Sequence, residues 1–333
     1  MSRSCSRRIL PRWGASETRI EDLEAETREH PFYDEFWATK AADLARITVR
    51  AYIVASWSDQ ALHTRGTLEG FKQIRSAQKW LEVHGRKKWY YYYEPQSVQR
   101  QQAFFDHFLL GKETSLSEWP KVRLEVRERY YVGDVRGEDE WPIARTRYTK
   151  LHLNCSTASL QSEPVSDGGT MRYDSVAGGA GPQGATFDFT FAAPTDLIGH
   201  MKLRVFVSAE QGDDMDLFVG IQKVDASGAL VPFTFYAQFE DGPVALGWLR
   251  VSHRELDAAR STEYQPGARA RARAQTLRRR SSACRYRNLA VGHGVRGRRA
   301  AAARHSRVRH LSHVIHAGGE WESYLLVPVV PPR

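Results

Sequence analysis

The sequence predicts an α/β domain with a parallel sheet, followed by an all-β sandwich of jelly-roll type. Two observations lead to this fold class. Between residues 47 and 110, short apolar segments of strand type alternate with amphipathic helical segments, which is the rhythm of α/β folds. After Trp119-Pro120 the apolar period changes from 3.6 to 2, and turn residues separate the alternating segments, as in antiparallel sandwiches. We place the boundary between the two parts near residue 112.

The first part begins with helical signals. Acidic side chains crowd the first turn of residues 17–45, and His30-Pro31 divides this stretch because a residue before proline avoids the helical region. Residues 47–56 form a near-continuous apolar strand, which suits a sheet buried on both faces. The elements expected after it are a helix at 66–75, a strand at 79–84 and a helix at 97–110 that ends at Gly111.

Strands with alternating polarity dominate the second part. One face of each strand is apolar and the other is charged or polar, which indicates sheets with one buried face. The alternating segments are 122–126, 187–191, 201–207 and 217–221, and strand character returns at 314–315 and 324–330.

The positive charge of the chain is concentrated in one segment. The net charge is +9 over 333 residues, yet residues 266–310 alone hold fourteen Arg and no Lys, Asp or Glu. The remainder therefore carries a net charge of −5, as in a mildly acidic globular protein. This segment has few large apolar side chains, so we expect it to be disordered. Its Arg, Ala, Gly and His are typical of GC-rich codons read out of frame, which predicts a frame shift there.

Cysteine usage and hydropathy point to a cytoplasmic protein. Cys5, Cys155 and Cys284 are odd in number and far apart, which disfavours a disulfide framework and a cysteine-rich metal site. No apolar run of 18 residues or more predicts a membrane span. Residues 1–16 lack the apolar core of a secretory signal. No metal or organic cofactor is implied.

Two side chains occupy the positions of a hydrolase acid and base. Asp59 follows the strand at 47–56, and His84 ends the strand at 79–84. α/β-Hydrolases order their triad Ser, Asp, His along the chain, and the acid holds the tautomer of the imidazole. His63 is a second candidate base, and Asp59 is equally suited to a turn or a helix cap. No Gly-x-Ser-x-Gly occurs, so we expect a fragment that lacks its nucleophile and is inactive alone.

Several motifs resemble one family in the family's own order. They are HPFYDEFW at 30–37, WSDQALHTRGTLEGF at 57–71, KWLEVHGRKKW at 79–89, FFDHFL at 104–109 and DMDLFV at 214–219. These motifs resemble the cocaine-esterase-like (CocE/NonD) serine hydrolases, a group that includes X-Pro dipeptidyl peptidases. The resemblance implies an α/β-hydrolase core with a Ser-Asp-His triad, a C-terminal jelly roll, and ester or X-Pro peptide substrates. By this likeness Asp59 is the triad acid and His84 the base.

The resemblance also assigns domains. They are a segment unlike the family at 1–16, the C-terminal part of an α/β-hydrolase domain at 17–111, a jelly roll at 112–265, the arginine-rich segment at 266–312 and the last sandwich strands at 313–333. The chain departs from the family at two places. Many relatives carry a Gly-Pro-Trp-Ser-His motif where this chain has Val-His-Gly-Arg-Lys-Lys-Trp, and Arg50 replaces a frequent proline.

Other functions remain open from the residues alone. The sandwich would also suit a non-catalytic, galactose-binding-like module for carbohydrate or protein. The arginine-rich segment would suit a nucleic-acid adaptor, although no aromatic platform beyond Tyr286 accompanies it. Asp213, Asp214 and Asp216 lack the Gly and Glu of a calcium loop, so we interpret them as turn residues. For the aromatic run 89–93 and the neighbouring lysines, packing and solvation are favoured over a pocket role.

Overall fold

The computed structural model describes residues 21–60, 62–174, 184–210, 214–236, 239–267, 282–295, 299–302 and 312–332, with backbone alone between 282 and 302. The chain forms two units, Met1–Ala42 and Asp43–Arg333, which are described separately. Among the helices of these described ranges, none is long and apolar enough to span a bilayer.

The first unit contains two short helices, α1 (Leu23–Glu29) and α2 (Glu35–Thr39). Each begins at an aspartate whose carboxylate accepts backbone N–H groups of the first turn, which satisfies donors that a helix leaves unpaired. His30-Pro31 lies between them, so the predicted interruption is confirmed.

The α/β part of the second unit is built on parallel strands. Strands β1 (Ala51–Ser56), β2 (Lys79–His84) and β3 (Val122–Arg129) pair in parallel, and β4 (Val132–Glu138) joins β3 antiparallel. The strand predicted at 79–84 has these bounds, whereas β1 begins four residues later than predicted. The other elements of this part are η1 (Leu44–Arg46), α3 (Thr64–Gln73), α4 (Lys88–Tyr93), α5 (Pro95–Leu110) and η2 (Ser115–Glu118).

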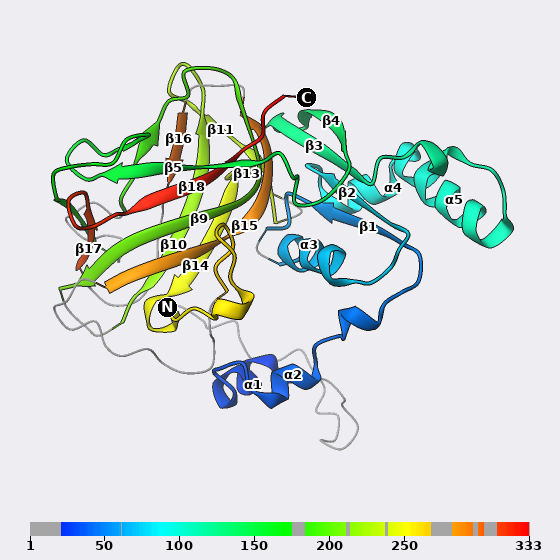
Figure 1. Ribbon diagram of the computed structural model, residues 1–333, viewed down its shortest axis with the longest axis horizontal. Helices are drawn as coiled ribbons and strands as arrows, with labels where there is room; N and C mark the ends of the chain where they lie inside the picture. Colours follow the sequence, from blue (N-terminus) through cyan, green and yellow to red (C-terminus); the bar gives the residue numbers. More distant parts are fainter. Residues whose placement is uncertain are drawn as a thin grey trace, which may run out of the picture. The chain divides into compact units, whose positions relative to one another are not determined.

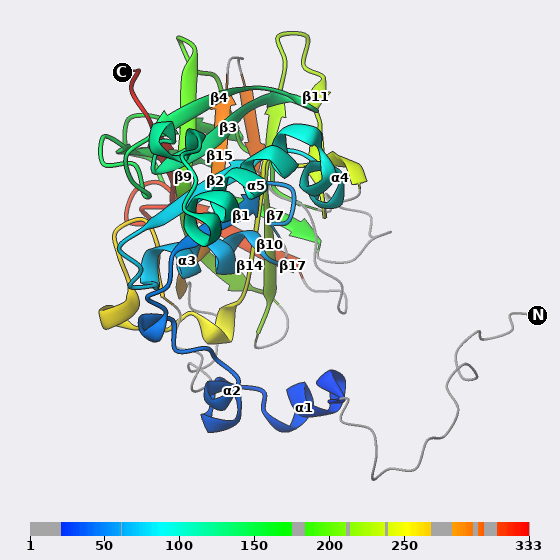
Figure 2. The same cartoon turned by 90° about the vertical axis from the view of Figure 1, so that its right-hand side faces the viewer.

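Helices cover the two faces of this sheet unequally. Leu68 and Phe71 of α3 pack against Leu81 and Val83 of β2 in one buried cluster. On the opposite face, Phe104 of α5 joins a smaller cluster with Trp80 and Leu116. Helices α4 and α5 project away from the long strands of the β-rich part in Figure 1, and they lie on the side that faces the viewer in Figure 2. Gly111 adopts φ 64°, which ends α5 as predicted.

The strand at 122–126 was expected to open the antiparallel sandwich, and the structure pairs it with neighbours of both directions. It lies within β3, which runs parallel to β2, with Leu81 opposite Val122, and antiparallel to β4. Alternating polarity reports that one face of a strand is buried, but it does not distinguish a parallel neighbour from an antiparallel one.

The β-rich part continues the same mixed sheet. Within the described ranges this sheet has 16 strands, and it runs from β1 through β3 and β15 (Ser282–Val295) to β9 (Thr195–Ala209). The remaining elements are β5 (Arg147–Asn154), β6 (Ser159–Gln161), β7 (Gly169–Asp174), β8 (Asp188–Phe189), β9 (Thr195–Ala209), β10 (Asp216–Val224), β11 (Leu230–Val231), β12 (Phe233–Phe235), β13 (Phe239–Gly242), β14 (Ala245–Arg250), η3 (Val251–His253), η4 (Ala258–Arg260), β17 (Ser312–Ala317) and β18 (Tyr324–Val329).

The long strand β9 organises the core of the β-rich part. It pairs antiparallel with β15, β17 and β18 (Figure 1). Its alternate side chains Met201, Val205 and Val207 enter the same buried cluster as Leu217 and Val219 of β10. The predicted apolar faces of these two strands are therefore confirmed.

Part of the arginine-rich segment is ordered backbone, contrary to expectation. Ser282–Val295 forms β15 and Arg299–Ala302 forms β16, which pair with β9 and β10. Neighbouring strands offer backbone hydrogen bonds whatever the side chains are, and this context overrides weak propensity. Residues 268–281, 296–298 and 303–311 of the segment lie outside the described residues.

The close pairing of β3 and β4 predicts a stability effect at Gly133 of β4. A methyl group there would lie 2.5 Å from the backbone oxygen of Val126 and 3.0 Å from Cα of Arg127. We expect Gly133→Ala to lower the free energy of unfolding by about 1–3 kcal/mol, because the backbone has to shift. Urea unfolding measures this change.

The control is Gly70→Ala in α3, where the added methyl group meets no heavy atom within 4 Å. This variant should be neutral or gain up to about 1 kcal/mol, because alanine favours helices. Equal losses in both variants would contradict the steric explanation.

Candidate active site

The parallel pairing of β1 and β2 brings the two predicted residues to one edge of the sheet. Ser56 lies opposite His84 at the carboxyl ends of these strands, and Trp57 N–H donates to the His84 carbonyl over 2.8 Å. Asp59 follows in the turn before α3, where its carbonyl accepts the N–H groups of His63 and Thr64 over 3.0 and 3.1 Å. Asp59 and His84 line the same cavity, of about 570 Å³.

The carboxylate of Asp59 is bound by a lysine rather than by the imidazole. Asp59 is 3% exposed, and Lys88 Nζ donates to its Oδ2 over 2.9 Å. In the part of the chain that the structure describes, no hydrogen bond joins Asp59 to His84. Lys88 was interpreted as solvated from the sequence, and this interpretation is wrong. The only sign of this pairing in the sequence was that Lys88 lies four residues after His84.

His84 is held as a neutral imidazole. Its ring stacks on Tyr91 with 3.7 Å between centroids, and its Nδ1 accepts the Arg86 N–H over 3.2 Å. Burial lowers the pKa of His84 to about 3, and the positive charges of Arg86, Arg100 and nearby arginines act in the same direction. A base in a triad has to accept a proton, and this environment opposes that step.

A buried carboxylate fixes the ring that His84 stacks on. Glu82 is 1% exposed and accepts hydrogen bonds from Tyr52, Tyr91, Arg100 and Arg123. Burial raises the pKa of Tyr91 to about 12, so its hydroxyl stays protonated and donates to Glu82. This cluster could not be predicted from the sequence, because its members come from β1, β2, β3, α4 and α5.

The aromatic run at 89–93 contributes Trp89, Tyr91 and Tyr92 to the lining of the cavity. It forms α4, and only Tyr91 among these five residues is buried. Trp89 and Tyr92 are 65% and 51% exposed and line the cavity. His63, the second candidate base, lines it as well, at the start of α3. Tyr91 is the buried member of the run and lines the cavity as well, so packing and a cavity role coincide at this residue.

The carboxylates of Asp214 and Asp216, at the start of β10, bind other side chains and backbone groups of the protein. Asp214 accepts the N–H and Oγ–H of Ser252, and Arg250 binds both carboxylate oxygens of Asp216 at 2.8 Å. Asp213 lies outside the described residues. No cluster of three metal-ligating side chains occurs in the described ranges.

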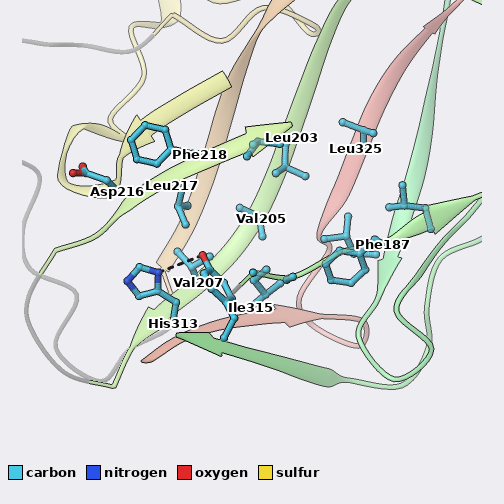
Figure 3. A pocket seen from close by; sticks show the side chains of 16 residues that line it. Phe187, Leu203, Val205, Val207, Asp216, Leu217, Phe218, His313, Ile315 and Leu325 are labelled. Atoms are coloured by element: carbon cyan, nitrogen blue, oxygen red, sulfur yellow. Dashed lines mark hydrogen bonds between the residues drawn. The ribbon is translucent and has the colours of Figure 1, made fainter. Parts of the chain in front are cut away.

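A second, smaller cavity of about 60 Å³ lies within the β-rich part (Figure 3). Its walls are almost wholly apolar, with Leu203, Val205 and Leu325 among them. His313 reaches its margin, where its Nδ1 lies 3.3 Å from the Tyr173 hydroxyl. Asp216 lines this cavity too, but both its carboxylate oxygens bind Arg250. The larger cavity, which holds Asp59 and His84, is therefore the candidate active site.

Comparisons with known proteins indicate the family to which the chain belongs. The sequence model of the X-Pro dipeptidyl-peptidase C-terminal non-catalytic domain matches residues 115–274. The structure of a CocE/NonD family hydrolase from Staphylococcus aureus is similar at 35% identity and a TM-score of 0.88, over 93% of this chain and 60% of that one. The chain belongs to this family of hydrolases, as its motifs indicated.

More distant structures share the fold. An aminopeptidase from the marine sediment archaeon Thaumarchaeota archaeon and an α-amino acid ester hydrolase are 15% and 16% identical, with TM-scores of 0.68 and 0.64. Each comparison covers 92% of this chain and 60% of the other. The chain thus spans about 60% of the length of the solved relatives it matches. No curated protein matches it significantly.

The low pKa of His84 predicts how stability depends on pH. Unfolding returns the imidazole to its ordinary pKa of 6.5, so between pH 6.5 and about 3 the unfolded chain binds more protons. The contribution of His84 to the free energy of unfolding is complete above pH 6.5 and falls by about 1.4 kcal/mol per pH unit below that pH. Between pH 6.5 and 4, we expect the free energy of unfolding of His84→Gln to decrease less steeply than that of the unchanged chain. Urea unfolding measures both.

An NMR titration of His84 provides the direct control. Its ring resonances should stay constant from pH 7 to pH 4.5. A midpoint above pH 6 would show that the ring is solvated and would contradict the environment described.

Proposed function

We propose that this chain supplies the acid and base of a serine hydrolase that cleaves esters or X-Pro peptide bonds. The observation that carries this proposal is that Asp59, in the turn after β1, and His84, at the end of the neighbouring parallel strand β2, line one cavity. Support comes from the family, and from relatives whose names describe an ester hydrolase and an aminopeptidase. The β-rich part, which we take to be a jelly roll, matches a domain named non-catalytic, so we assign the chemistry to the α/β part.

The proposed reaction is acyl transfer to a serine. His84 takes the proton of the attacking hydroxyl and returns it to the leaving group, while Asp59 stabilises the imidazolium. Asp59 first has to exchange Lys88 for His84, because the carboxylate is paired with the lysine at 2.9 Å. The sequence contains no Gly-x-Ser-x-Gly, so we propose that the 333-residue chain alone does not turn over substrate.

A non-catalytic binding module is the second candidate. The specific observation in its favour is that Lys88 pairs with Asp59 while His84 remains neutral, which leaves the acid and base uncoupled. Binding on a glycan array, without any ester hydrolysis in the fusion described below, would favour this candidate.

The isolated chain should neither hydrolyse a p-nitrophenyl ester nor be labelled by a fluorophosphonate. The reason is that the acid and base accelerate attack only through a nucleophile, and removing the nucleophile alone abolishes triad catalysis. Gel fluorescence and release of p-nitrophenol measure both outcomes. Labelling of the isolated chain at a serine would contradict the proposal.

A fusion tests the catalytic roles. The part of the Staphylococcus aureus relative that this chain does not cover is joined to its N-terminus, and we expect ester hydrolysis to appear. Asp59→Asn should then lower kcat by about 10³–10⁴-fold, as loss of a triad acid does. Asp106→Asn, at an aspartate on α5 paired with Lys112, is the matched control and should leave kcat unchanged. A folded but inert fusion would overturn the proposed function.

A further inference from the structure

The turn that carries Asp59 is fixed to the β-rich part by its next residue. The side-chain amide of Gln60 donates to the Val244 carbonyl over 2.7 Å, and both residues are 2% exposed. Val244 lies between β13 and β14, and its own N–H donates to the Ile221 carbonyl of β10 over 2.7 Å. A buried hydrogen bond that loses one partner leaves a desolvated polar group behind. Movement of the Asp59 turn away from β14 is therefore costly.

The loop that follows His84 is fixed at its start by β3. Residues 85–87 form this loop, which we call the base loop, and α4 begins directly after it. The Glu125 carboxylate accepts the Gly85 N–H over 2.8 Å and pairs with the Arg86 guanidinium at 3.1 Å. Glu125 is 4% exposed, so this carboxylate is a buried anchor for the first half of the loop.

Tyr131, at the tip of the β3–β4 hairpin, fixes the rest of the base loop. Its carbonyl accepts a hydrogen bond from the Arg86 guanidinium over 2.6 Å, and its hydroxyl accepts the Lys87 N–H over 3.1 Å. Tyr131 adopts φ 55°, a conformation for which glycine or asparagine is the usual choice. Such backbone positions persist where surrounding contacts compensate for them, and they gather at functional sites. The two hydrogen bonds to the base loop are contacts of this kind.

The β-rich part reaches the base loop as well. Glu240 of β13 pairs with Lys87 at 2.5 Å and accepts the Tyr130 hydroxyl over 3.0 Å. The Glu240 side chain is 61% exposed, so this pair contributes less than the buried contact at Val244. Glu240 and Val244 both belong to residues 239–244. One short segment of the β-rich part thus contacts the turn of the acid and the loop of the base.

We propose that residues 239–244 of the β-rich part and Tyr131 position Asp59 and His84 for the reaction. The segment 239–244 acts on the acid through Gln60, and Tyr131 acts on the base through the base loop. Neither is among the described residues that line the cavity, so both act through other residues. Placement matters, because a shift of about 1 Å in a catalytic group can lower a rate by about 100-fold.

This inference rests on the proposed function and extends it to the β-rich part. The positioning residues lie within 115–274, the range that matches a domain named non-catalytic. The chemistry stays with the α/β part, but the geometry of the acid and base depends on contacts that the matched range provides.

The Lys88–Asp59 pair reports on both contacts. Lys88 begins α4 directly after the base loop, and its Nζ lies 2.9 Å from Oδ2 of Asp59 in the turn that Gln60 fixes. Release of the turn or of the base loop therefore opens this pair. An ammonium held against a buried carboxylate is less accessible to a reagent than one in water.

Acetylation of Lys88 tests the inference in the isolated chain, without a catalytic assay. Acetic anhydride at limiting dose labels accessible amines, and mass spectrometry compares Lys88 with Lys112, whose side chain is 57% exposed. We expect Gln60→Leu and Tyr131→Phe each to raise the labelling of Lys88 by about threefold relative to Lys112, because the pair opens locally. Tyr131→Phe removes a single hydroxyl, and it carries the test if Gln60→Leu does not fold.

The matched control is Gln265→Leu. Gln265 is also a buried glutamine, 5% exposed, and its amide joins the β-rich part to Glu69 of α3. Lys72 of α3 donates to its oxygen over 2.9 Å, and none of these three residues lines the cavity. This variant should leave Lys88 labelling unchanged. Equal increases in both glutamine variants would show that lower stability alone opens the pair, and would overturn the inference. Unchanged labelling in both Gln60→Leu and Tyr131→Phe would do so too.

The fusion described above adds a kinetic readout. Gln60→Leu should lower kcat by about tenfold or more and change KM by less than about twofold, because Gln60 positions the acid without contacting substrate. Gln265→Leu should leave both unchanged. An inert fusion overturns the hydrolase, while Lys88 labelling still decides the positioning. An active fusion in which Gln60→Leu leaves kcat unchanged keeps the hydrolase and overturns the positioning.

Discussion

The parallel register of β1 and β2 is the constraint on which the candidate site depends. With Ser56 opposite His84, the turn after β1 and the end of β2 meet at one edge of the sheet. A shift by one residue would turn His84 to the other face, away from the cavity and from Tyr91. The register is secured by apolar contacts between β2 and α3 on one face and by the Glu82 cluster on the other.

Buried charge then decides what the site does at neutral pH. Glu82 balances Arg100 and Arg123, so Tyr91 is fixed and the imidazole has a flat apolar surface on one side. The same arginines oppose a positive charge on His84, whose pKa of about 3 makes protonation at pH 7 cost about 5 kcal/mol. The carboxylate that would offset this cost is paired with Lys88. The site is thus assembled in space while its acid and base remain electrostatically uncoupled.

Local pattern predicted those features of the fold that depend on nearby residues. The strand at 79–84 and the end of α5 at Gly111 follow from apolar period and from a left-handed glycine. The pattern could not tell that β3 pairs parallel to β2, because a buried face looks alike in both arrangements. It also missed the order of Ser282–Val295, which depends on pairing with β9.

The same limit explains the candidate site. Asp59 and His84 were identifiable because each follows a strand, and strand ends in a parallel sheet meet. Lys88 could not be identified as a residue of the site, because its partner Asp59 lies 29 residues away in the sequence and across a turn. The sequence places a charge, but only the fold decides whether that charge is solvated or paired.

Coupling of the acid and base therefore requires a change of partners, not a change of fold. Lys88 is 33% exposed in its side chain, so water can solvate its ammonium once Asp59 leaves it. Asp59 is buried and gains nothing from water, but it would stabilise an imidazolium at His84 directly. Covering the cavity would strengthen this effect, because removal of water lowers the local dielectric and increases the attraction between opposite charges.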